Sequence, residues 1–384
     1  MRATDPSQAK LAFLIPMLGA GGAERVTIDI ARGLRPHVRA IDIVTNESVG
    51  EFVENVGPDI TLQSVDSYHI GKVIWRLRAF FDREKPDIVF AQGTRMSVQS
   101  ALAWLLGRHR PHIIWCLHNP YSTKHDLYSP PIAAIVTRAV AWLAKIPTRI
   151  IGVSEGVCRS FVDFCGKEFS VKTSVLHNPI PPYVGIDIDR SEVVRPARLI
   201  AVGRLERQKN FALLIDAIDL VRQQEDVRLS VYGQGPLRDS LQQQIDVLGL
   251  QDIVTLEGYA SDIRDRMAQS DMFVLSSSWE GLPTVLIEAM TTGIPVVSTD
   301  CRHGPFEILE GGKWGRLVAE AVPSALAQAI VDVLRSGGPD PRPRAADFAP
   351  SNVIDRYQDL IRDVLAESGK SALIDKASGS CPAC

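Results

Sequence analysis

Short apolar runs alternate with stretches of helical periodicity along almost the whole chain. In the first half, such runs predict buried strands at 11–15, 40–44, 88–91, 113–117, 149–153 and 173–176. In the second half, they predict strands at 199–202, 228–232, 253–256, 272–275, 295–298 and 315–318. Between them, apolar residues recur at helical spacing, as in 23–34, where Val26, Ile30 and Leu34 share one face. This alternation is typical of parallel α/β architecture, which we therefore predict.

The length and the proline pattern predict two domains. A chain of 384 residues fits two domains at about 150 residues each. The stretch 177–196 is rich in proline, lacks periodicity and is interpreted as a linker. We predict one Rossmann-like domain at 1–185 and a second at 186–345. A last helix, within 346–384, is expected to return to the first domain and to be followed by a disordered tail.

Two doubly wound domains that face each other bind ligands in the cleft at the carboxyl ends of their strands. The loops that follow the predicted strands are therefore the places where functional side chains are expected. Further helices are predicted in the second half and at the C-terminal end, at 210–223, 236–248, 283–291, 323–335 and 351–367.

The composition narrows the class of protein. Apolar residues make up 45% of the chain and charged residues 23%, which is ordinary for a globular enzyme. The net charge of −3 argues against nucleic acid as the main ligand. The N-terminal region lacks the form of a signal peptide, and no apolar run reaches the ~20 residues of a spanning helix. These features predict a cytoplasmic protein.

The charge is unevenly distributed. Residues 61–150 contain twelve Lys and Arg against five Asp and Glu, so this stretch carries +7 and the rest −10. Aromatic residues are interleaved with the basic ones, and they include Trp75, Trp104 and Trp142. Basic residues mixed with tryptophan can form a membrane-facing surface, but ordinary amphipathic helices give the same pattern. The sequence leaves both interpretations open.

The cysteines indicate reduced thiols rather than a disulfide framework. Four of them, Cys116, Cys158, Cys165 and Cys301, lie in apolar or helical contexts. Cys381 and Cys384 have a Cys-x-x-Cys spacing, but a structural zinc site needs four ligands and no second pair is present. We expect this end of the chain to be a tail without function.

The segment from Glu280 to Glu288 is the most informative in the chain. It follows the predicted strand 272–275, and a helix is expected to start near Pro283. Proline fits the first turn of a helix, because its missing N–H costs nothing there. The N–H groups of 284–286 would then form an anion site, with one carboxylate beside it and one deeper. A diphosphate between two sugars has this layout. A surface acid followed by an unremarkable helical glutamate fits the spacing equally well.

Other predicted strand ends in the second domain carry cations and glycines. Arg204 can make a forked contact to phosphate oxygens, and Lys209 adds a compact charge near a helix start. Gly233 and Tyr259 follow the next two strands, where a nucleobase would find a flat slot and backbone hydrogen bonds. When each segment is considered alone, a solvated charged loop explains the one with Arg204 and Lys209, and ordinary turns explain those with Gly233 and Tyr259.

The first domain offers a glycine loop and a histidine. Gly21 and Gly22 follow the first strand and let a ligand approach the backbone, although the loop matches neither the dinucleotide nor the P-loop motif. His118 follows the strand 113–117 and is a candidate hydrogen-bond donor or proton shuttle. A ligand-free turn and a structural histidine are the alternatives. All these candidates stand at strand ends, which favours one common ligand site.

These residues together resemble those of the retaining nucleotide-sugar glycosyltransferases of family 4, which share the GT-B fold. The resemblance extends over about residues 10–366. It rests on Gly21-Gly22-Ala23-Glu24-Arg25, His118, Gly203-Arg204 with Lys209, the Glu280–Glu288 segment and a loop at 300–307 that is frequent in members that build bacterial surface glycans. It implies two Rossmann-like domains around a central cleft.

The resemblance also implies roles for individual residues. Glu288 would hold the ribose of the nucleotide, and Glu280 would hold hydroxyls of the transferred sugar. Arg204 and Lys209 would neutralise the departing diphosphate, and His118 would contact the donor sugar or the attacking hydroxyl. The remaining donor-binding candidates are Gly21, Gly22, Gly233, Tyr259, Gly281, Leu282, Pro283, Thr284 and Val285.

The implied activity is the transfer of a sugar, with retention, from a nucleoside-diphosphate sugar to a glycan or lipid-linked acceptor in the synthesis of cell-surface polysaccharide, lipopolysaccharide or glycolipid. No metal or other cofactor is expected, and the chain's Asp-x-Asp, at Asp187 and Asp189, lies in the linker. The site is expected on the cytoplasmic face of the membrane, with peripheral membrane contact. The alternatives are an epimerase or phosphorylase on the same fold and a non-catalytic subunit that binds nucleotide sugars.

Overall fold

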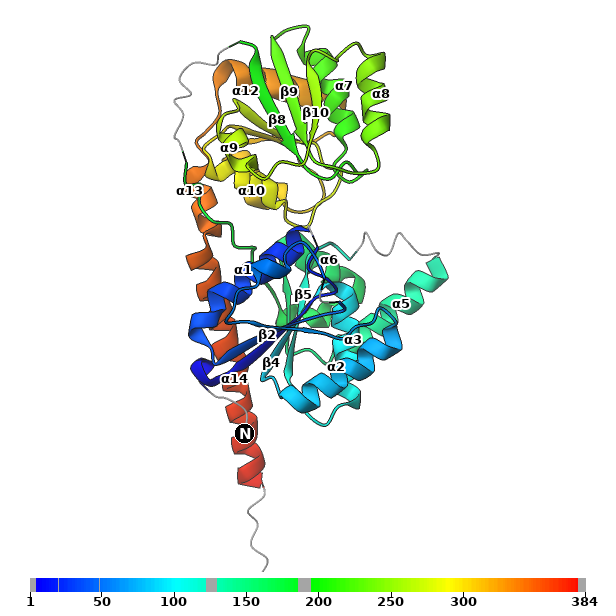
Figure 1. Ribbon diagram of the computed structural model, residues 1–384, viewed down its shortest axis with the longest axis vertical. Coiled ribbons are helices and arrows are strands. Elements are labelled where there is room, and N and C mark those ends of the chain that lie inside the picture. Colours follow the sequence, from blue (N-terminus) through cyan, green and yellow to red (C-terminus); the bar gives the residue numbers. More distant parts are fainter. Residues whose placement is uncertain (1–4, 20, 48, 122–129, 186–194, 379–384) are drawn as a thin grey trace, which may run out of the picture. The chain divides into compact units, whose positions relative to one another are not determined.

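The computed structural model describes the whole chain except residues 1–4, 20, 48, 122–129, 186–194 and 379–384, and it describes no side chains at 130–131 and 368–378. The chain divides into two compact units (Figure 1). Unit 1 consists of residues 1–179 and 350–384, and unit 2 of residues 180–349. Each unit is built on a parallel sheet with helices, so the predicted α/β fold is confirmed.

Unit 1 contains a parallel sheet that has seven strands in the described residues, in the order β3-β2-β1-β4-β5-β6-β7. The strands are β1 (Lys10–Leu14), β2 (Ala40–Thr45), β3 (Thr61–Ser64), β4 (Ile88–Gln92), β5 (His112–Leu117), β6 (Arg149–Gly152) and β7 (Thr173–Val175). All except β3 were predicted. β3 is an edge strand of sequence Thr-Leu-Gln-Ser that is not fully buried, so it lacks the apolar run that marks the inner strands.

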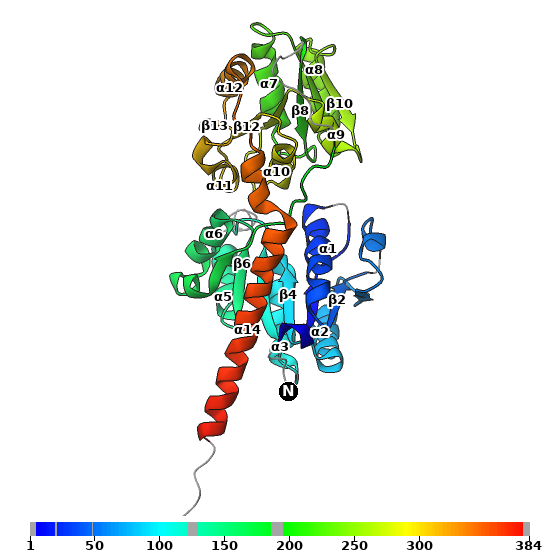
Figure 2. The ribbon, with the colours of Figure 1, turned by 90° about the vertical axis from the view of Figure 1, so that its left-hand side faces the viewer.

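Helices cover both faces of this sheet. They are α1 (Gly22–Leu34), α2 (Ile70–Glu84), α3 (Gly93–Leu106), α5 (Pro130–Leu143), α6 (Glu155–Cys165) and α14 (Pro350–Ser378), with 3-10 turns at Pro6–Gln8, Arg35–His37, Val53–Asn55 and Lys167–Lys172. The last helix, α14, packs against α1 and runs along that side of unit 1 (Figure 2). Phe13 of β1, Ile30 of α1 and Ile361 of α14 belong to one buried cluster. The C-terminal helix therefore returns to the first domain, as predicted.

The contact between α1 and α14 depends on Gly33. A Cβ atom at Gly33 would lie 2.6 Å from both Cγ1 and Cδ1 of Ile354. Gly33→Ala is therefore expected to lower the free energy of unfolding by about 1–3 kcal/mol, because a packed helix pair must separate to admit the methyl group. Denaturant titration measures this change.

Gly22→Ala is the matched control for Gly33→Ala. Gly22 lies in the same helix, and a Cβ atom there meets nothing within 4 Å. Because alanine favours helix more than glycine does, this variant is expected to be neutral or slightly more stable than the parent. Equal losses of stability in the two variants would contradict this account of the packing.

Unit 2 contains a parallel sheet with six strands in the described residues, in the order β10-β9-β8-β11-β12-β13. The strands are β8 (Ala197–Val202), β9 (Val227–Tyr232), β10 (Val254–Gly258), β11 (Met272–Leu275), β12 (Val296–Thr299) and β13 (Arg316–Val318). The helices are α7 (Phe211–Val221), α8 (Arg238–Val247), α9 (Ile263–Ala268), α10 (Thr284–Thr291), α11 (Pro305–Ile308), α12 (Pro323–Ser336) and α13 (Arg342–Ala345), with 3-10 turns at Glu310–Gly312 and Ala346–Phe348. The strands and the larger helices lie where the apolar pattern predicted them.

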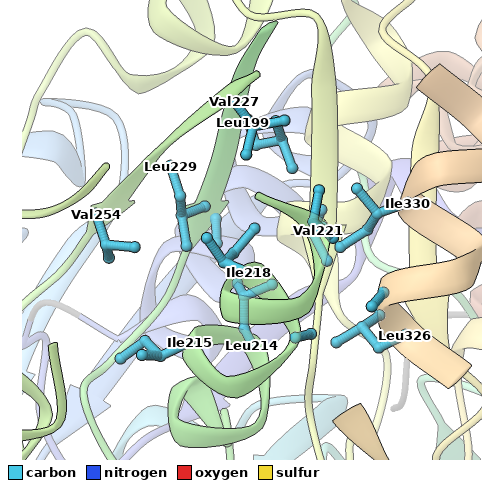
Figure 3. Packing of buried hydrophobic residues seen from close by; sticks show 14 of the residues in the cluster. Leu199, Leu214, Ile215, Ile218, Val221, Val227, Leu229, Val254, Leu326 and Ile330 are labelled. Atoms are coloured by element: carbon cyan, nitrogen blue, oxygen red, sulfur yellow. The ribbon is translucent and has the colours of Figure 1, made fainter. Parts of the chain in front are cut away.

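The core of unit 2 forms where α7 packs on the sheet. Leu214 and Ile218 of α7 lie in one buried cluster with Leu229 of β9 and with Leu326 and Ile330 of α12 (Figure 3). Burying both faces of α7 in this way explains its nearly continuous apolar sequence. The core holds the strands in place, and thus fixes the loops at their carboxyl ends.

The units divide at different residues from the predicted domain boundaries. The first boundary lies between Pro179 and Ile180 instead of 185 and 186, and the second between Ala349 and Pro350 instead of 345 and 346. The Ile180 N–H donates to the Phe348 carbonyl at 2.8 Å. This hydrogen bond joins the first residues of unit 2 to its last ones. The predicted Asp187 and Asp189 pair and the Cys381 and Cys384 pair lie outside the described residues.

Two further sequence expectations concern helices and thiols. In the described part of the chain, no helix combines the length and apolar character needed to cross a membrane. Cys116 and Cys165 are buried and Cys158 and Cys301 are half-buried, and none of these four is in a disulfide with another described residue. The prediction of reduced cysteines holds for these four residues.

Candidate functional site

The carboxyl ends of the strands in unit 2 all meet at one edge of its sheet, because the strands are parallel. Two backbone hydrogen bonds join the loops there. The Gly203 N–H donates to Tyr232 O at 2.9 Å, and the Gly233 N–H donates to Gly258 O at 2.8 Å. Tyr259 follows directly and is exposed. The predicted site residues after β8, β9 and β10 are therefore neighbours at this edge.

Glu280 is the buried centre of the same edge. Its side chain accepts hydrogen bonds at Oε1 from Lys209 Nζ, at 2.6 Å, and from Ser277 Oγ, at 2.7 Å. Gln208 Nε2 donates to Oε2 at 3.3 Å. Glu280 is only 5% exposed, and a buried carboxylate is tolerated when it is paired and hydrogen-bonded in this way. Glu280 is therefore a fixed part of the site and not the surface acid of the alternative interpretation.

The loops around this ion pair are joined to one another. Ser276 Oγ, after β11, donates to Lys209 O, in the loop after β8, at 2.8 Å. Thr299 Oγ1, at the end of β12, donates to Ser277 O at 2.7 Å. Three neighbouring strand ends thus hold the Lys209–Glu280 pair in one geometry, which is the preorganisation that a charged transition state needs.

Cys301 lies next to the pair on the loop after β12. Burial raises the pKa of its thiol to about 12, the negative charge of Glu280 adds to this increase, and the positive charge of Lys209 opposes it. At neutral pH the thiol is therefore protonated, so it adds no charge to the site. The electrostatics of this edge are dominated by Lys209, Glu280 and the other ionised side chains.

The start of α10 differs in detail from the prediction. Pro283 is the N-cap of α10, and the helix begins at Thr284, so Pro283 does not lie in the first turn. The Leu286 N–H donates to Pro283 O at 3.0 Å, which makes the prediction of a free amide at Leu286 wrong. The predicted anion-binding amides of the first turn are reduced to those of Thr284 and Val285.

The remaining ionic candidates of unit 2 are available to a ligand to different degrees. Glu288 is half-buried, and its carboxylate has no hydrogen bond or ion pair with any described residue. The Arg204 side chain is 71% exposed, with Nη1 3.2 Å from Glu206 Oε1. Lys209 Nζ has three donors and uses one on Glu280, so it can contact a second anion.

The other predicted residues lie in unit 1. His118, directly after β5, contacts Gln92 at the end of β4, with 2.7 Å between His118 Nε2 and Gln92 Oε1. Gly21 is the N-cap of α1 and Gly22 its first residue. Each unit is described by itself, so the convergence of these residues with those of unit 2 on one cleft stays a prediction.

Several residues of the site were not predicted from the sequence. Gln92, Gln208 and Ser277 hold the predicted side chains in place through the hydrogen bonds given above. Gln92 ends β4 and Ser277 lies two residues after β11, whereas Gln208 lies in the loop that joins β8 to α7. A search for every polar residue at such positions, and not only for charges and glycines, would have found them.

Family models match the larger part of each unit. The model described as Glycosyltransferase Family 4 matches residues 20–183, and the one described as Glycosyl transferases group 1 matches residues 196–336. The second match contains the Lys209–Glu280 pair and Glu288. The chain is a family 4 glycosyltransferase.

Relatives of this glycosyltransferase extend over different parts of its length. An α-1,4-N-acetyl-D-galactosaminyltransferase of Campylobacter jejuni is 24% identical over 92% of this chain and 99% of its own. The amylovoran biosynthesis glycosyltransferase AmsD of Erwinia amylovora is 26% identical over 78% of this chain and 84% of its own. An uncharacterized glycosyltransferase of Methanocaldococcus jannaschii is 30% identical over 62% of this chain, and the match spans only 60% of that relative.

Solved structures agree on the fold of this glycosyltransferase. Anabaena HepE, in complex with UDP and glucose, has a TM-score of 0.76 at 22% identity, over 93% of this chain and 100% of HepE. Sucrose-phosphate synthase from Thermosynechococcus elongatus has a TM-score of 0.76 at 17% identity, over 94% of this chain and 100% of its own. These similarities confirm the GT-B fold.

Proposed function

We propose that this glycosyltransferase moves a sugar from a nucleoside-diphosphate sugar to a glycan or lipid-linked acceptor, in the synthesis of cell-surface polysaccharide, lipopolysaccharide or glycolipid. The observation that carries the proposal is the buried Lys209–Glu280 ion pair at the edge of the sheet where α10 begins. Glu288 lies in α10, and its carboxylate has no partner among the described residues. HepE, which shares the fold, is described in complex with UDP-glucose, and the Campylobacter relative is named for transfer to a glycan on diphospho-undecaprenol.

Different residues of the site bind different parts of the donor. Glu288 accepts hydrogen bonds from the ribose, and Glu280 accepts them from hydroxyls of the transferred sugar. Lys209 and Arg204, with the Thr284 and Val285 amides, neutralise the diphosphate as it leaves. Because these groups supply the positive charge, we propose that transfer needs no metal ion.

We propose that transfer proceeds with retention at the anomeric carbon. The acceptor oxygen forms a bond to this carbon on the face from which the diphosphate departs, while the bond from carbon to diphosphate oxygen breaks. The departing phosphate takes the acceptor's proton, and the transition state resembles an oxocarbenium ion. His118 contacts the donor sugar or the attacking hydroxyl. A proton NMR spectrum of the first-formed product reads the anomeric configuration and thus tests retention.

Glu288→Ala is expected to weaken donor binding about 10- to 100-fold, because a charge-assisted hydrogen bond to the ribose contributes about 1.5–3 kcal/mol. A thermal-shift titration with UDP-, GDP- and ADP-sugars measures the affinity, since a bound ligand raises apparent stability by mass action. One of these nucleotide sugars is expected to raise the melting temperature of the parent. Glu288→Ala is expected to require a higher concentration of it for the same increase in melting temperature. Glu320→Ala, at an exposed glutamate outside the site, is the control.

A labelled donor separates the proposed reaction from its alternatives. A transferase moves the label from the nucleotide to an acceptor, whereas an epimerase leaves the sugar on the nucleotide, and a phosphorylase consumes phosphate. A non-catalytic subunit would bind the donor and leave it unchanged. We propose that the reaction takes place on the cytoplasmic side of a membrane, where a lipid-linked acceptor would meet the nucleotide sugar.

A further inference from the structure

The outer face of α5 in unit 1 is apolar. Ile132, Ile135 and Trp142 are 50%, 65% and 58% exposed. Their spacing of three and seven residues places them on one side of the helix, together with the exposed Ala139. Ordinary surface helices turn their polar face outward, so this face lacks a partner among the residues that the structure describes.

Two cations lie beside this face: Arg138 is in α5, and Lys145 follows the last residue of the helix, Leu143, by two positions. Arg138 and Lys145 are exposed, and neither side chain forms an ion pair or a hydrogen bond within the described residues. The sequence of α5 contains no aspartate or glutamate. The face therefore combines isoleucine and tryptophan side chains with positive charge that no carboxylate of the helix offsets.

The neighbouring helices extend this surface. α5 packs on α3, and α3 packs on α2, so the three helices form one layer on the side of the sheet away from α14 (Figure 1). In α2, Ile70 and Trp75 are 59% and 57% exposed. Arg78 stacks over Trp75, with its Cζ 5.2 Å from the ring centroid, and its Nε donates to Leu106 O, at the end of α3, at 3.0 Å. This contact links the exposed aromatic of α2 to the exposed Leu106.

The sequences of α2, α3 and α5 contain two acidic residues, both in α2, and both side chains are already engaged. Asp82 accepts hydrogen bonds from the Arg108 and His109 N–H groups, at 2.8 Å each. Glu84 pairs with Lys10 at 2.7 Å. The unpaired Arg138 and Lys145 therefore leave positive charge on the layer, in agreement with the basic excess of residues 61–150.

We propose that the outer face of α5, extended by α2 and the end of α3, binds a lipid bilayer that contains anionic headgroups. Tryptophan and isoleucine would enter the boundary between headgroups and acyl chains, and Arg138 and Lys145 would contact the headgroups. A symmetric contact with a second copy is disfavoured, because it would bring the unpaired cations of two identical faces together. The inference deepens the proposed membrane location and needs no residue of the donor site.

Co-sedimentation of the full chain with vesicles tests this inference. Binding to phosphatidylcholine vesicles that contain phosphatidylglycerol is expected to exceed binding to pure phosphatidylcholine, and added salt is expected to weaken it. The double variant Ile135→Gln, Trp142→Gln is expected to partition at least about tenfold less, since it removes two exposed apolar side chains. Val171→Gln is the control, because Val171 is 91% exposed but belongs to the 3-10 turn before β7.

Three results would overturn the inference: equal binding to both kinds of vesicle, parent-like binding by the double variant, or an equal loss in the control. If the double variant instead changes the sedimentation coefficient without lipid and leaves vesicle binding intact, the face is a protein interface. The nucleotide-sugar thermal shift of the double variant should equal that of the parent. A missing thermal shift in both proteins would count against the proposed donor site, whatever the vesicles show.

Discussion

Lys209→Met is expected to lower kcat for sugar transfer about 100- to 1,000-fold, the loss that follows the removal of one preorganised group from a developing charge. Lys209 Nζ lies 2.6 Å from Glu280 Oε1, and the two side chains are 16% and 7% exposed. The variant therefore removes the cation proposed for the departing diphosphate and also leaves a buried carboxylate without its counter-charge. Steady-state transfer of a labelled sugar measures the first effect.

The second effect of Lys209→Met, the loss of the counter-charge of Glu280, concerns stability. It separates the catalytic role of the ion pair from its structural role. Removing one partner of a buried ion pair costs about 3 kcal/mol of stability, because the other charge stays buried. The double variant Lys209→Met, Glu280→Gln is expected to recover part of this loss, since no uncompensated charge remains. Its transfer activity should stay as low as that of the single variant.

A surface lysine provides the control for Lys209→Met. Lys313 pairs with Glu310 at 3.1 Å but is 64% exposed, so Lys313→Met is expected to change stability by less than about 1 kcal/mol and to leave kcat unchanged. Parent-like turnover in Lys209→Met would show that the cation has no part in transfer. A double variant no more stable than Lys209→Met would show that the pair is not electrostatically coupled.

Gly233→Ala is expected to lower the free energy of unfolding by about 4 kcal/mol or more, at the upper end of single substitutions. Gly233 has a φ of +144°, and a Cβ atom there would lie 1.9 Å from Gly203 O. Because the obstacle is backbone, relief requires the loop after β8 to move, and Arg204 with it. Denaturant titration measures the stability, and donor binding is expected to fall together with it.

Gly249→Ala separates close approach from backbone conformation. Gly249 has a φ of +63°, and nothing lies within 4 Å of a Cβ atom built there. This control is expected to cost about 1–2 kcal/mol, the penalty for a left-handed residue with a side chain. Equal decreases in the free energy of unfolding of the two variants would contradict this account. They would show that position 233 does not require glycine because of the close contact between the loops after β8 and β9.

The fold was predictable where burial produced a continuous apolar run. Twelve strands were predicted and found, and nine of them are inner strands of the two parallel sheets, where burial on both faces produces such a run. β3 was missed because the edge strand Thr61–Ser64 has no such run. The domain boundaries were displaced because the proline-rich stretch marks irregular backbone, whereas the units are set by long-range contacts such as that between Ile180 and Phe348.

The site was predictable as a set of strand ends but not as a set of contacts. Periodicity placed Lys209 and Glu280 after different strands, 71 residues apart, and only the sheet order brings their loops together. Gln208 and Ser277 were missed because uncharged polar residues are common in loops. The capping position of Pro283 depends on backbone angles that a proline at a helix start does not determine by itself.

A crystal structure of the full chain with the nucleotide sugar that gives the largest thermal shift tests the central claim most directly. The account predicts ribose hydroxyls on the Glu288 carboxylate, sugar hydroxyls on Glu280, and diphosphate oxygens within hydrogen-bond distance of Lys209 Nζ and the Arg204 guanidinium. A nucleotide bound elsewhere, with Glu280, Lys209 and Glu288 all out of contact with it, would contradict the account.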